Sequence, residues 1–155
     1  MSDLITAKRW IMGGGVFNCI VAFPFSMPFL SEHYIKLFNW INKTIGFGGN
    51  PWVPPSDGGN MLFLNTAGLA LFLVGMILIY ASKDVSSRIE IALLNGLVRF
   101  VWAIVALHYL VNYKIINVLY LIVIIDLILA SAYIYYYWSI KNKTRQEYNA
   151  LHAEI

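Results

Sequence analysis

Residues 91–112 read IALLNGLVRFVWAIVALHYLVN, and residues 115–138 read IINVLYLIVIIDLILASAYIYYYW. An α-helix rises about 1.5 Å per residue, so about 20 apolar residues cross a hydrocarbon core of about 30 Å. Both segments reach that length, and each carries a single charged residue near its middle, Arg99 in the first and Asp126 in the second. Because lipid leaves the backbone groups of an isolated strand unpaired, these segments predict membrane-spanning helices.

Two more segments, residues 10–30 and 61–81, are also long and apolar and contain no charged residue. The first follows Lys8 and Arg9, as in a signal peptide, but it exceeds the roughly 7–15 residues of a signal h-region, so we expect a retained span. The composition agrees, because 59% hydrophobic and 12% charged residues lie outside the range of soluble domains. The predicted fold class is therefore all-α, with one integral membrane four-helix bundle formed by residues 1–155.

The longest connection, residues 31–60, is predicted to be an outer loop with two parts. Its first part, SEHYIKLFNWINK, repeats apolar residues at helical spacing, which predicts a short helix lying on the outer interface. Its second part, IGFGGNPWVPPSDGGN, is too rich in glycine and proline for regular structure, and we expect Trp52 to anchor it to the bilayer or to cap the bundle. Residues 112–114 predict a tight hairpin between the last two spans. The polar tail, residues 139–155, is expected to continue the last helix into the cytoplasm.

The basic residues predict the orientation of the chain. Four crossings place both termini and the loop at residues 82–90 on one side, and that side carries seven basic residues against three on the other. By the positive-inside rule the richer side is cytoplasmic. The seven are Lys8, Arg9, Lys83, Arg88, Lys141, Lys143 and Arg145, and the three are Lys36, Lys43 and Lys114.

The two charged residues inside the spans are predicted to meet. A charged side chain in the middle of a bilayer costs about 2.5–3.5 kcal/mol on insertion scales, and such residues usually face the interior of a bundle. Arg99 lies nine residues beyond Glu90, or about 14 Å along the helix, and Asp126 lies twelve residues beyond Lys114, or about 18 Å. Those depths coincide from opposite sides of a core of about 30 Å. We therefore predict a buried, hydrogen-bonded ion pair between Arg99 and Asp126.

Other polar side chains share the faces of these two residues. Asn18 lies about nine residues into the first span, and Asn95 precedes Arg99 by one helical turn. Small residues on the same faces would let the helices approach closely, and side-chain amides can bond across such contacts. The candidate cluster, which is either a binding site or a structural element, consists of Arg99, Asp126, Asn18, Asn95 and Asn65, with Tyr133 as a secondary candidate on the face of Asp126.

This cluster has two interpretations. It can be an internal polar staple that fixes the register of the helices, or it can line a cavity that binds a polar headgroup, a quinone or a proton. No second carboxylate accompanies Asp126, so general acid–base catalysis is unsupported and no catalytic residue is predicted. We predict no cofactor and no metal; the cavity interpretation admits a quinone or a lipid.

The remaining residues with potential chemistry give weaker signals. His108 is a secondary candidate that faces away from Arg99 near the outer interface, where we interpret it as a polar anchor. Haem would need a second axial ligand, and His33 is the other histidine on that side. Cys19 is the only cysteine, which excludes an intrachain disulfide and a CxxC pair. The basic residues form no run, so nucleic acid is not an expected partner.

The stretch from Asp84 through SSRIEIALLNGLVRFVWAIVAL, followed by LYLIVIIDLILA, resembles the small four-helix bacterial membrane proteins of the DoxX and DoxX-like group. In that group an arginine in the third helix and an acidic residue in the fourth recur together, and the resemblance maps them to Arg99 and Asp126. Pro24 and Pro28, at the end of the first span, fit the same layout. The resemblance implies a location in the bacterial inner (plasma) membrane. Some members are associated with thiosulfate and quinone oxidation or with oxidative-stress complexes, but this chain shows no motif that carries such a role across.

The leading functional hypothesis is a non-enzymatic integral membrane protein, either an accessory subunit or a small lipid-binding module. Its expected partners are membrane lipid and other membrane protein subunits. One alternative is a redox-associated protein whose polar cluster contacts a quinone headgroup. A second alternative is a small proton-coupled transporter, which is the weakest of the three because the first span offers only Asn18 where transporters of this size usually carry a carboxylate.

Overall fold

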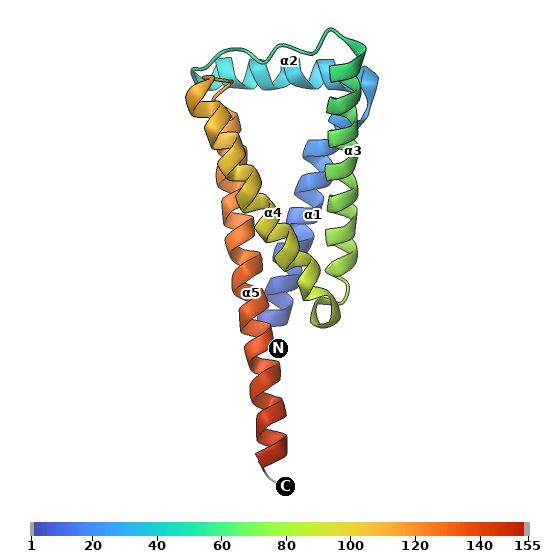
Figure 1. The fold of residues 1–155 in the computed structure, drawn as a ribbon, viewed down its shortest axis with the longest axis vertical. Helices are drawn as coiled ribbons and strands as arrows, with labels where there is room; N and C mark the ends of the chain where they lie inside the picture. Colours follow the sequence, from blue (N-terminus) through green and yellow to red (C-terminus); the bar gives the residue numbers. More distant parts are fainter. Residues whose placement is uncertain (1, 154–155) are drawn as a thin grey trace.

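The computed structural model describes residues 2–153 and is all-helical across them (Figure 1). The sequence prediction of an all-α fold is confirmed. Helices α3, α4 and residues 119–146 of α5 are each long and apolar enough to cross a membrane, whereas α1 reaches that criterion only together with α2. The five helices are α1 (Ser2–Ser26), α2 (Pro28–Ile45), α3 (Gly58–Ala81), α4 (Val85–Asn112) and α5 (Leu119–Ala153).

The first predicted span, residues 10–30, is wrong at its end. Helix α1 stops at Ser26, and α2 leaves it at an angle of 114°. Pro28 causes the break, because its ring cannot continue a helix and it forces the preceding residue into an extended conformation. Met27 adopts that conformation, with φ −110° and ψ 117°. Pro28 instead begins α2, where the first turn tolerates a missing N–H group.

Helix α2 lies across one end of the bundle, above the other four helices (Figure 1). It contains the predicted short helix but is longer, at 18 residues, because Pro28 starts it before Ser31 and Gly46 ends it in a left-handed conformation with φ 80°. Phe38 on its inner face packs against Phe25 and Trp52. Trp52 is fixed by Asn39, whose side chain bonds both the Trp52 carbonyl and the Trp52 amide at 2.8 and 2.9 Å. Trp52 therefore caps the bundle, one of its two predicted roles.

The connection between α4 and α5 is longer than predicted. The fourth span was expected to start at residue 115, but α5 begins at Leu119, and residues 113–118 form an irregular connection. This connection is held by the segment that follows α2: Asn50 N–H donates to the Lys114 carbonyl at 2.6 Å, and Asn117 N–H donates to Gly48 at 3.2 Å. These pairings satisfy backbone groups that a tight hairpin would have satisfied internally.

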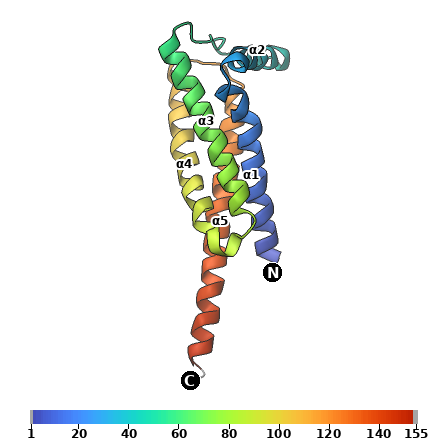
Figure 2. The ribbon, with the colours of Figure 1, turned by 90° about the vertical axis from the view of Figure 1, so that its right-hand side faces the viewer.

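The four long helices form two close pairs, α1 with α3 and α4 with α5, as seen in Figures 1 and 2. Glycine makes the first pairing possible. A Cβ at Gly75 would lie 2.8 Å from the Gly15 carbonyl, and a Cβ at Gly68 would lie 2.5 Å from the backbone of Phe25 and Ser26. Small residues at such contacts let helix backbones approach without side chains between them.

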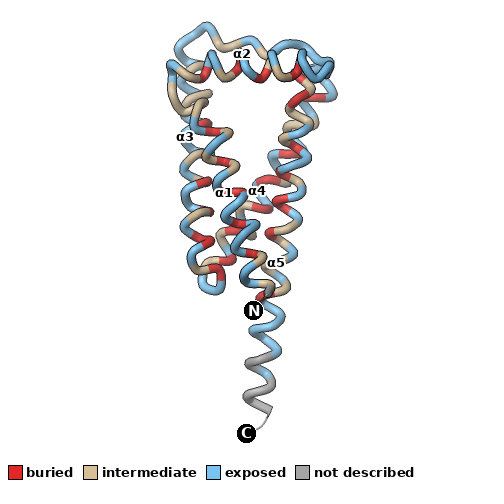
Figure 3. The backbone as a smooth tube through the Cα atoms, turned by 180° about the vertical axis from the view of Figure 1, so that it is seen from behind, coloured by how far each residue is buried: buried red, intermediate tan, exposed pale blue. Residues whose placement is uncertain are grey.

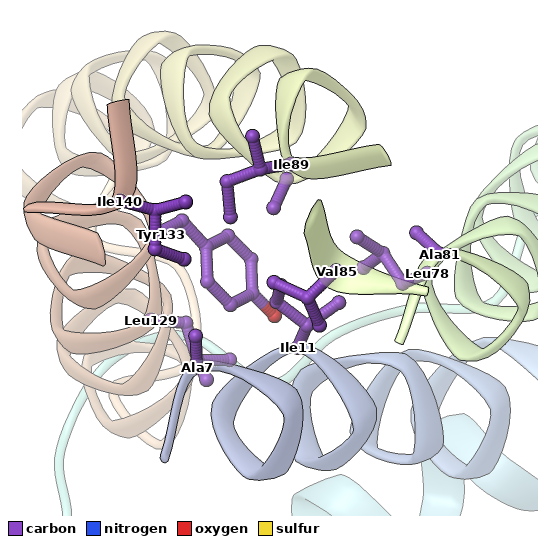
Figure 4. Packing of buried hydrophobic residues seen from close by; sticks show 10 residues of the cluster. Ala7, Ile11, Leu78, Ala81, Val85, Ile89, Leu129, Tyr133 and Ile140 are labelled. Atoms are coloured by element: carbon purple, nitrogen blue, oxygen red, sulfur yellow. The ribbon is translucent and has the colours of Figure 1, made fainter. Parts of the chain in front are cut away.

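The two pairs join tightly at the end opposite α2. We call this region the terminal half, because it contains the start of α1 and the turn between α3 and α4. Figure 4 shows the ring of Tyr133 surrounded by apolar side chains from its neighbours. Buried residues follow the inward faces of the helices there (Figure 3). The terminal half is built on Ala7, Ile11, Leu78, Ala81, Val85, Ile89, Ala92, Leu129, Tyr133 and Ile140.

The last helix continues beyond the bundle as predicted for the tail, and the described part of residues 139–155 is helical through Ala153. The start of this extension is tied to α1, because Lys143 Nζ and Ser139 Oγ both approach Asp3 Oδ2, at 2.6 and 3.0 Å. Lys141 forms a second ion pair, with Glu90 of α4, at 2.5 Å. These exposed pairs orient α5 but contribute little stability in water.

Candidate functional site

Arg99 occupies the centre of the bundle and is 5% exposed. Its guanidinium contacts two other helices and one residue of its own helix. Nη1 forms an ion pair with Asp126 Oδ1 of α5, Nη2 donates to Asn18 Oδ1 of α1 at 2.6 Å, and Nε donates to Asn95 Oδ1 at 2.8 Å. The predicted buried ion pair between Arg99 and Asp126 is confirmed. We refer to Arg99, Asp126, Asn18 and Asn95 as the polar cluster.

The local sequence explains why these four side chains meet. Asn95 and Arg99 are one turn apart on α4 and therefore share a face. Gly75 brings α3 against Asn18 on α1, since a Cβ there would lie 3.0 Å from Asn18 Cβ. Asn18 and Asp126 are 9% and 7% exposed, so the cluster as a whole is buried. Burial of this kind requires both charges to be paired, because an isolated charge is very costly in a medium of low dielectric constant.

The polar cluster leaves several hydrogen-bond donors unused. The bonds above engage three of the five guanidinium N–H groups of Arg99. Both asparagines accept from Arg99 through their oxygens, and within residues 2–153 neither amide nitrogen has a hydrogen-bond partner. The cluster therefore presents more free donors than acceptors, and its free acceptor is the carboxylate of Asp126, whose Oδ1 is ion-paired with Arg99 but accepts no hydrogen bond among the described residues.

Tyr133 lies seven residues, or about two turns, beyond Asp126 on α5, and it borders the polar cluster on the side of the terminal half. Its ring centroid is 5.9 Å from the Arg99 guanidinium carbon, a cation–π distance. Its hydroxyl donates to the Trp10 carbonyl at 3.5 Å. Gly14 makes room for that hydroxyl, because a Cβ at Gly14 would overlap it. Tyr133 is fully buried in the terminal half, so its contact with the polar cluster is through its ring face.

Two candidates from the sequence lie away from the polar cluster. Asn65 donates to the Phe25 carbonyl at 2.7 Å, where α1 ends and its last carbonyl groups have no partner further along the helix. It stands ten residues, or about 15 Å, along α3 from Gly75, which contacts Asn18. His108 is exposed and bonds within its own helix, to Asn112. Neither residue joins Arg99.

A cavity of about 470 Å³ opens from the polar cluster toward α2. Its walls are apolar except at the cluster itself, and Phe25, Phe38 and Trp52 close its α2 end. Inward-facing side chains of α1, α3, α4 and α5 complete the walls. They include Phe17, Val21, Ala22, Leu64, Ala67, Gly68, Leu71, Val74, Ile77, Leu78, Ile91, Leu94, Val98, Trp102, Leu119 and Ile122.

The cavity is open sideways, between α3 and α4. These two helices are joined by a short turn and diverge toward α2, which leaves the triangular outline seen in Figure 1. Lining side chains along the gap are also exposed on the outside of the bundle: Leu71, Ile77, Leu94, Val98 and Trp102. The opening therefore faces whatever surrounds the apolar helices, and α2 with its aromatic residues covers the direction along the bundle axis.

The position of the polar cluster divides the cavity unequally. On α3 the lining runs from Leu78 to Leu64, a length of about 21 Å, and Asn18 lies near the Leu78 end. Most of the apolar volume thus lies between the polar cluster and α2. An elongated molecule would fit with its polar end at Arg99 and its apolar part toward α2 or out through the gap.

Sequence reasoning located the polar cluster and gave a cavity lined by it as one of two interpretations, but it did not predict the other walls of the cavity or its opening. The aromatic residues that close it, Phe25, Phe38 and Trp52, come from three segments that meet only after the chain bends at Met27. The signal available in the sequence was Pro28, which predicts a helix boundary. Trp102, which lines the gap, carries no pattern that distinguishes it from an interfacial tryptophan.

Comparison of the chain with protein-family models, curated proteins and solved structures gave no match. The fold and the site therefore define the class on their own. Residues 2–153 form an all-helical bundle, three or four of whose segments are long and apolar enough to cross a membrane. Inside it a buried Arg99–Asp126 ion pair lies at one end of an apolar cavity with a lateral opening.

Proposed function

We propose that this protein is a non-enzymatic integral membrane protein that holds one amphipathic, lipid-like molecule in the cavity between α3 and α4. The observation that carries the proposal is the chemistry of the cavity, whose walls are apolar everywhere except at the polar cluster. Ligand sites of this kind combine a large apolar surface with a few polar groups that fix orientation. The lateral opening supports uptake from the bilayer.

The proposal extends to the surroundings of the protein. The distribution of basic residues supports cytoplasmic termini, and the resemblance to DoxX-like proteins supports a bacterial inner membrane. In this setting the protein would serve as an accessory subunit or as a lipid-binding module. Helix α5 supports a subunit role, because it extends beyond the bundle and offers a helical surface to a partner.

One alternative from another class is a redox-associated protein that contacts a quinone headgroup. The unused N–H donors beside the cavity favour it, since quinone oxygens are hydrogen-bond acceptors. A proton-coupled transporter receives no comparable support. The terminal half is filled by apolar side chains around Tyr133, which gives protons no polar route from the polar cluster to that end among the described residues.

The test is to identify what the purified protein carries. The protein is extracted in mild detergent, washed free of bulk lipid and analysed by native mass spectrometry, followed by extraction of the bound molecules. We expect one lipid-like molecule per chain. Ala67→Phe places a ring in the cavity and should remove that molecule, whereas Ala70→Phe, at an exposed position of α3 outside the cavity lining, should retain it. A wild-type protein that carries nothing, in several detergents, would overturn the proposal.

A further inference from the structure

The polar cluster is electrically neutral before any ligand binds. Arg99 and Asp126 form an ion pair, and Asn18 and Asn95 are uncharged. Among the residues that the structure describes, no other charged side chain lines the cavity. A ligand with a charged head would therefore give the buried site a net charge with no counter-charge beside it, and such a charge is strongly disfavoured in a medium of low dielectric constant.

The free hydrogen-bonding groups of the cluster specify the complementary head. The amide nitrogens of Asn18 and Asn95 and two guanidinium N–H groups of Arg99 are donors without partners among residues 2–153. Against these donors the free acceptor of the cluster is the carboxylate of Asp126, whose Oδ1 contacts Arg99 through the ion pair and accepts no hydrogen bond among the described residues. A head rich in carbonyl oxygens satisfies this set, and it can include a hydroxyl that donates to Asp126.

The depth of the polar cluster in the membrane also restricts which ligand heads can reach it. If the helices cross a membrane as proposed, the cluster lies near the middle of the hydrocarbon core, because Arg99 is fourteen residues, or about 21 Å, from the start of α4 at Val85 and thirteen residues, or about 20 Å, from its end at Asn112. A phosphate or ammonium head would have to leave the aqueous interface completely to reach that depth. An uncharged head reaches it at a much smaller cost.

From these observations we infer that the cavity selects an uncharged lipid whose head presents carbonyl oxygens, and that it rejects phospholipids. The inference rests on the proposed function and specifies the ligand class. Two kinds of molecule carry this chemistry, a long-chain quinone and a neutral glycerolipid such as a diacylglycerol. The carbonyl oxygens would accept from Asn18, Asn95 and Arg99. The tail would occupy the apolar volume below α2 and leave through the gap beside Val98 and Trp102.

Binding can be measured with defined probes. The lipid-free protein in detergent is titrated with decylubiquinone, dioctanoylglycerol, dioctanoylphosphatidylglycerol and dioctanoylphosphatidylcholine, and complexes are counted by native mass spectrometry. We expect at least one of the uncharged probes to bind, roughly tenfold or more tightly than either phospholipid. Comparison of decylubiquinone with dioctanoylglycerol shows which of the two kinds of uncharged ligand, quinone or glycerolipid, the cavity binds. Equal or tighter binding of phosphatidylglycerol would overturn the inference while leaving the proposed function intact, and failure of all four probes would count against both.

A charge variant tests the reason for the selectivity. Asp126→Asn keeps an acceptor for Arg99 but leaves the cluster with a net positive charge, so phosphatidylglycerol should gain at least tenfold relative to dioctanoylglycerol. Asn95→Asp is the counterpart, because it keeps an oxygen for Arg99 Nε, removes the free amide donor and adds a negative charge; it should weaken both probes. Unchanged selectivity in a folded Asp126→Asn protein would overturn the inference. If that variant does not fold, unchanged binding in Asn95→Asp would overturn it instead.

Discussion

The two halves of this bundle are built from similar residues, but one half is tightly packed and the other contains a cavity. In the terminal half, α1, α4 and α5 close around Tyr133, and small residues such as Gly14 and Ala92 bring the backbones together. In the half below α2 the α1–α3 pair diverges from the α4–α5 pair, and the space between the two pairs remains a cavity of about 470 Å³. A protein interior normally has few voids larger than a water molecule. The open half therefore has room for the occupant that we propose, and the tightly packed terminal half stabilises the bundle around that space.

The polar cluster lies at the boundary between the two halves. Arg99 bonds α1 through Asn18 and α5 through Asp126, so it links the two helix pairs at the level where they begin to separate. The two interpretations of the cluster thus become compatible. The ion pair can fix the register of the helices while its remaining N–H groups face the cavity.

The largest expected effect comes from breaking this link. Arg99→Leu or Asp126→Leu alone leaves one buried charge unpaired, and each should lower the free energy of unfolding by about 3–5 kcal/mol. The double replacement removes both charges and should recover most of that loss. Thermal unfolding in detergent, followed by circular dichroism, measures the cycle. Additive losses in the double variant would mean that the two residues do not stabilise the fold as a pair.

A second, smaller effect should appear where the terminal part of α1 meets α3. A Cβ at Gly15 would lie 2.8 Å from the Gly75 carbonyl and 3.0 Å from the Ile79 amide, so Gly15→Ala must push two backbones apart. We expect a loss of about 1–3 kcal/mol. Gly13→Ala is the matched control, because nothing lies within 4 Å of its Cβ and alanine favours the helix. Equal stability of both variants would show that the α1–α3 contact is looser than described.

A larger side chain in the open half should hardly change the free energy of unfolding. Ala67→Phe directs its ring into the cavity, so we expect a change in unfolding free energy within about 0.5 kcal/mol, the range of substitutions that disturb no packing. Ala92→Phe, in the fully packed terminal half, is the comparison and should cost at least about 1–3 kcal/mol. Both variants are compared with the wild type by thermal unfolding, followed by circular dichroism, in detergent without added ligand. Similar losses at the two positions would remove the contrast between the halves.

The smallest effect concerns the exposed helix caps, one at each end of the bundle. Hydrogen bonds from Asn60 lower the pKa of Asp57 at the start of α3, and those from Ser86 and Ser87 lower the pKa of Asp84 at the start of α4. Because both pKa values are depressed in the fold, the caps stabilise above the unfolded pKa of about 3.9, and that contribution is lost as the pH falls through the folded pKa.

This loss should be similar at both ends, since both carboxylates are exposed. Helical circular dichroism should fall slightly at acid pH in the wild type. Asp57→Asn and Asp84→Asn keep a capping oxygen but cannot titrate, so each should reduce the acid-dependent change. An unaltered acid response in the double variant would assign the change to other carboxylates.

The sequence predicted the parts of this molecule that depend on local pattern. The apolar lengths of residues 61–81 and 91–112 predicted α3 and the end of α4, although α4 begins six residues earlier, at Val85. The similar depths expected for Arg99 and Asp126 predicted their pairing. The bend at Met27 was missed because the apolar run continues past Pro28, and hydropathy does not register a change of direction.

A cavity beside the polar cluster was one interpretation of the sequence, but its shape and extent could not be predicted, for a different reason. It exists because α3 and α4 diverge, and that angle is set by contacts far apart in the chain. Phe38 of α2 packs on Phe25 and Trp52, and the segment after α2 holds the connection before α5. These contacts together fix how far the helix pairs spread, and no single segment encodes them. Asn65 was assigned to the polar cluster from helical phase alone, which carries no information on depth.

A crystal structure grown from a lipid mesophase would test the central claim most directly. The account predicts elongated density in the cavity between α3 and α4, with its polar end at hydrogen-bond distance, about 2.7–3.2 Å, from Arg99 or from the amides of Asn18 and Asn95. Helices α3 and α4 in contact along their length, with side chains filling the space beside Arg99, would contradict it.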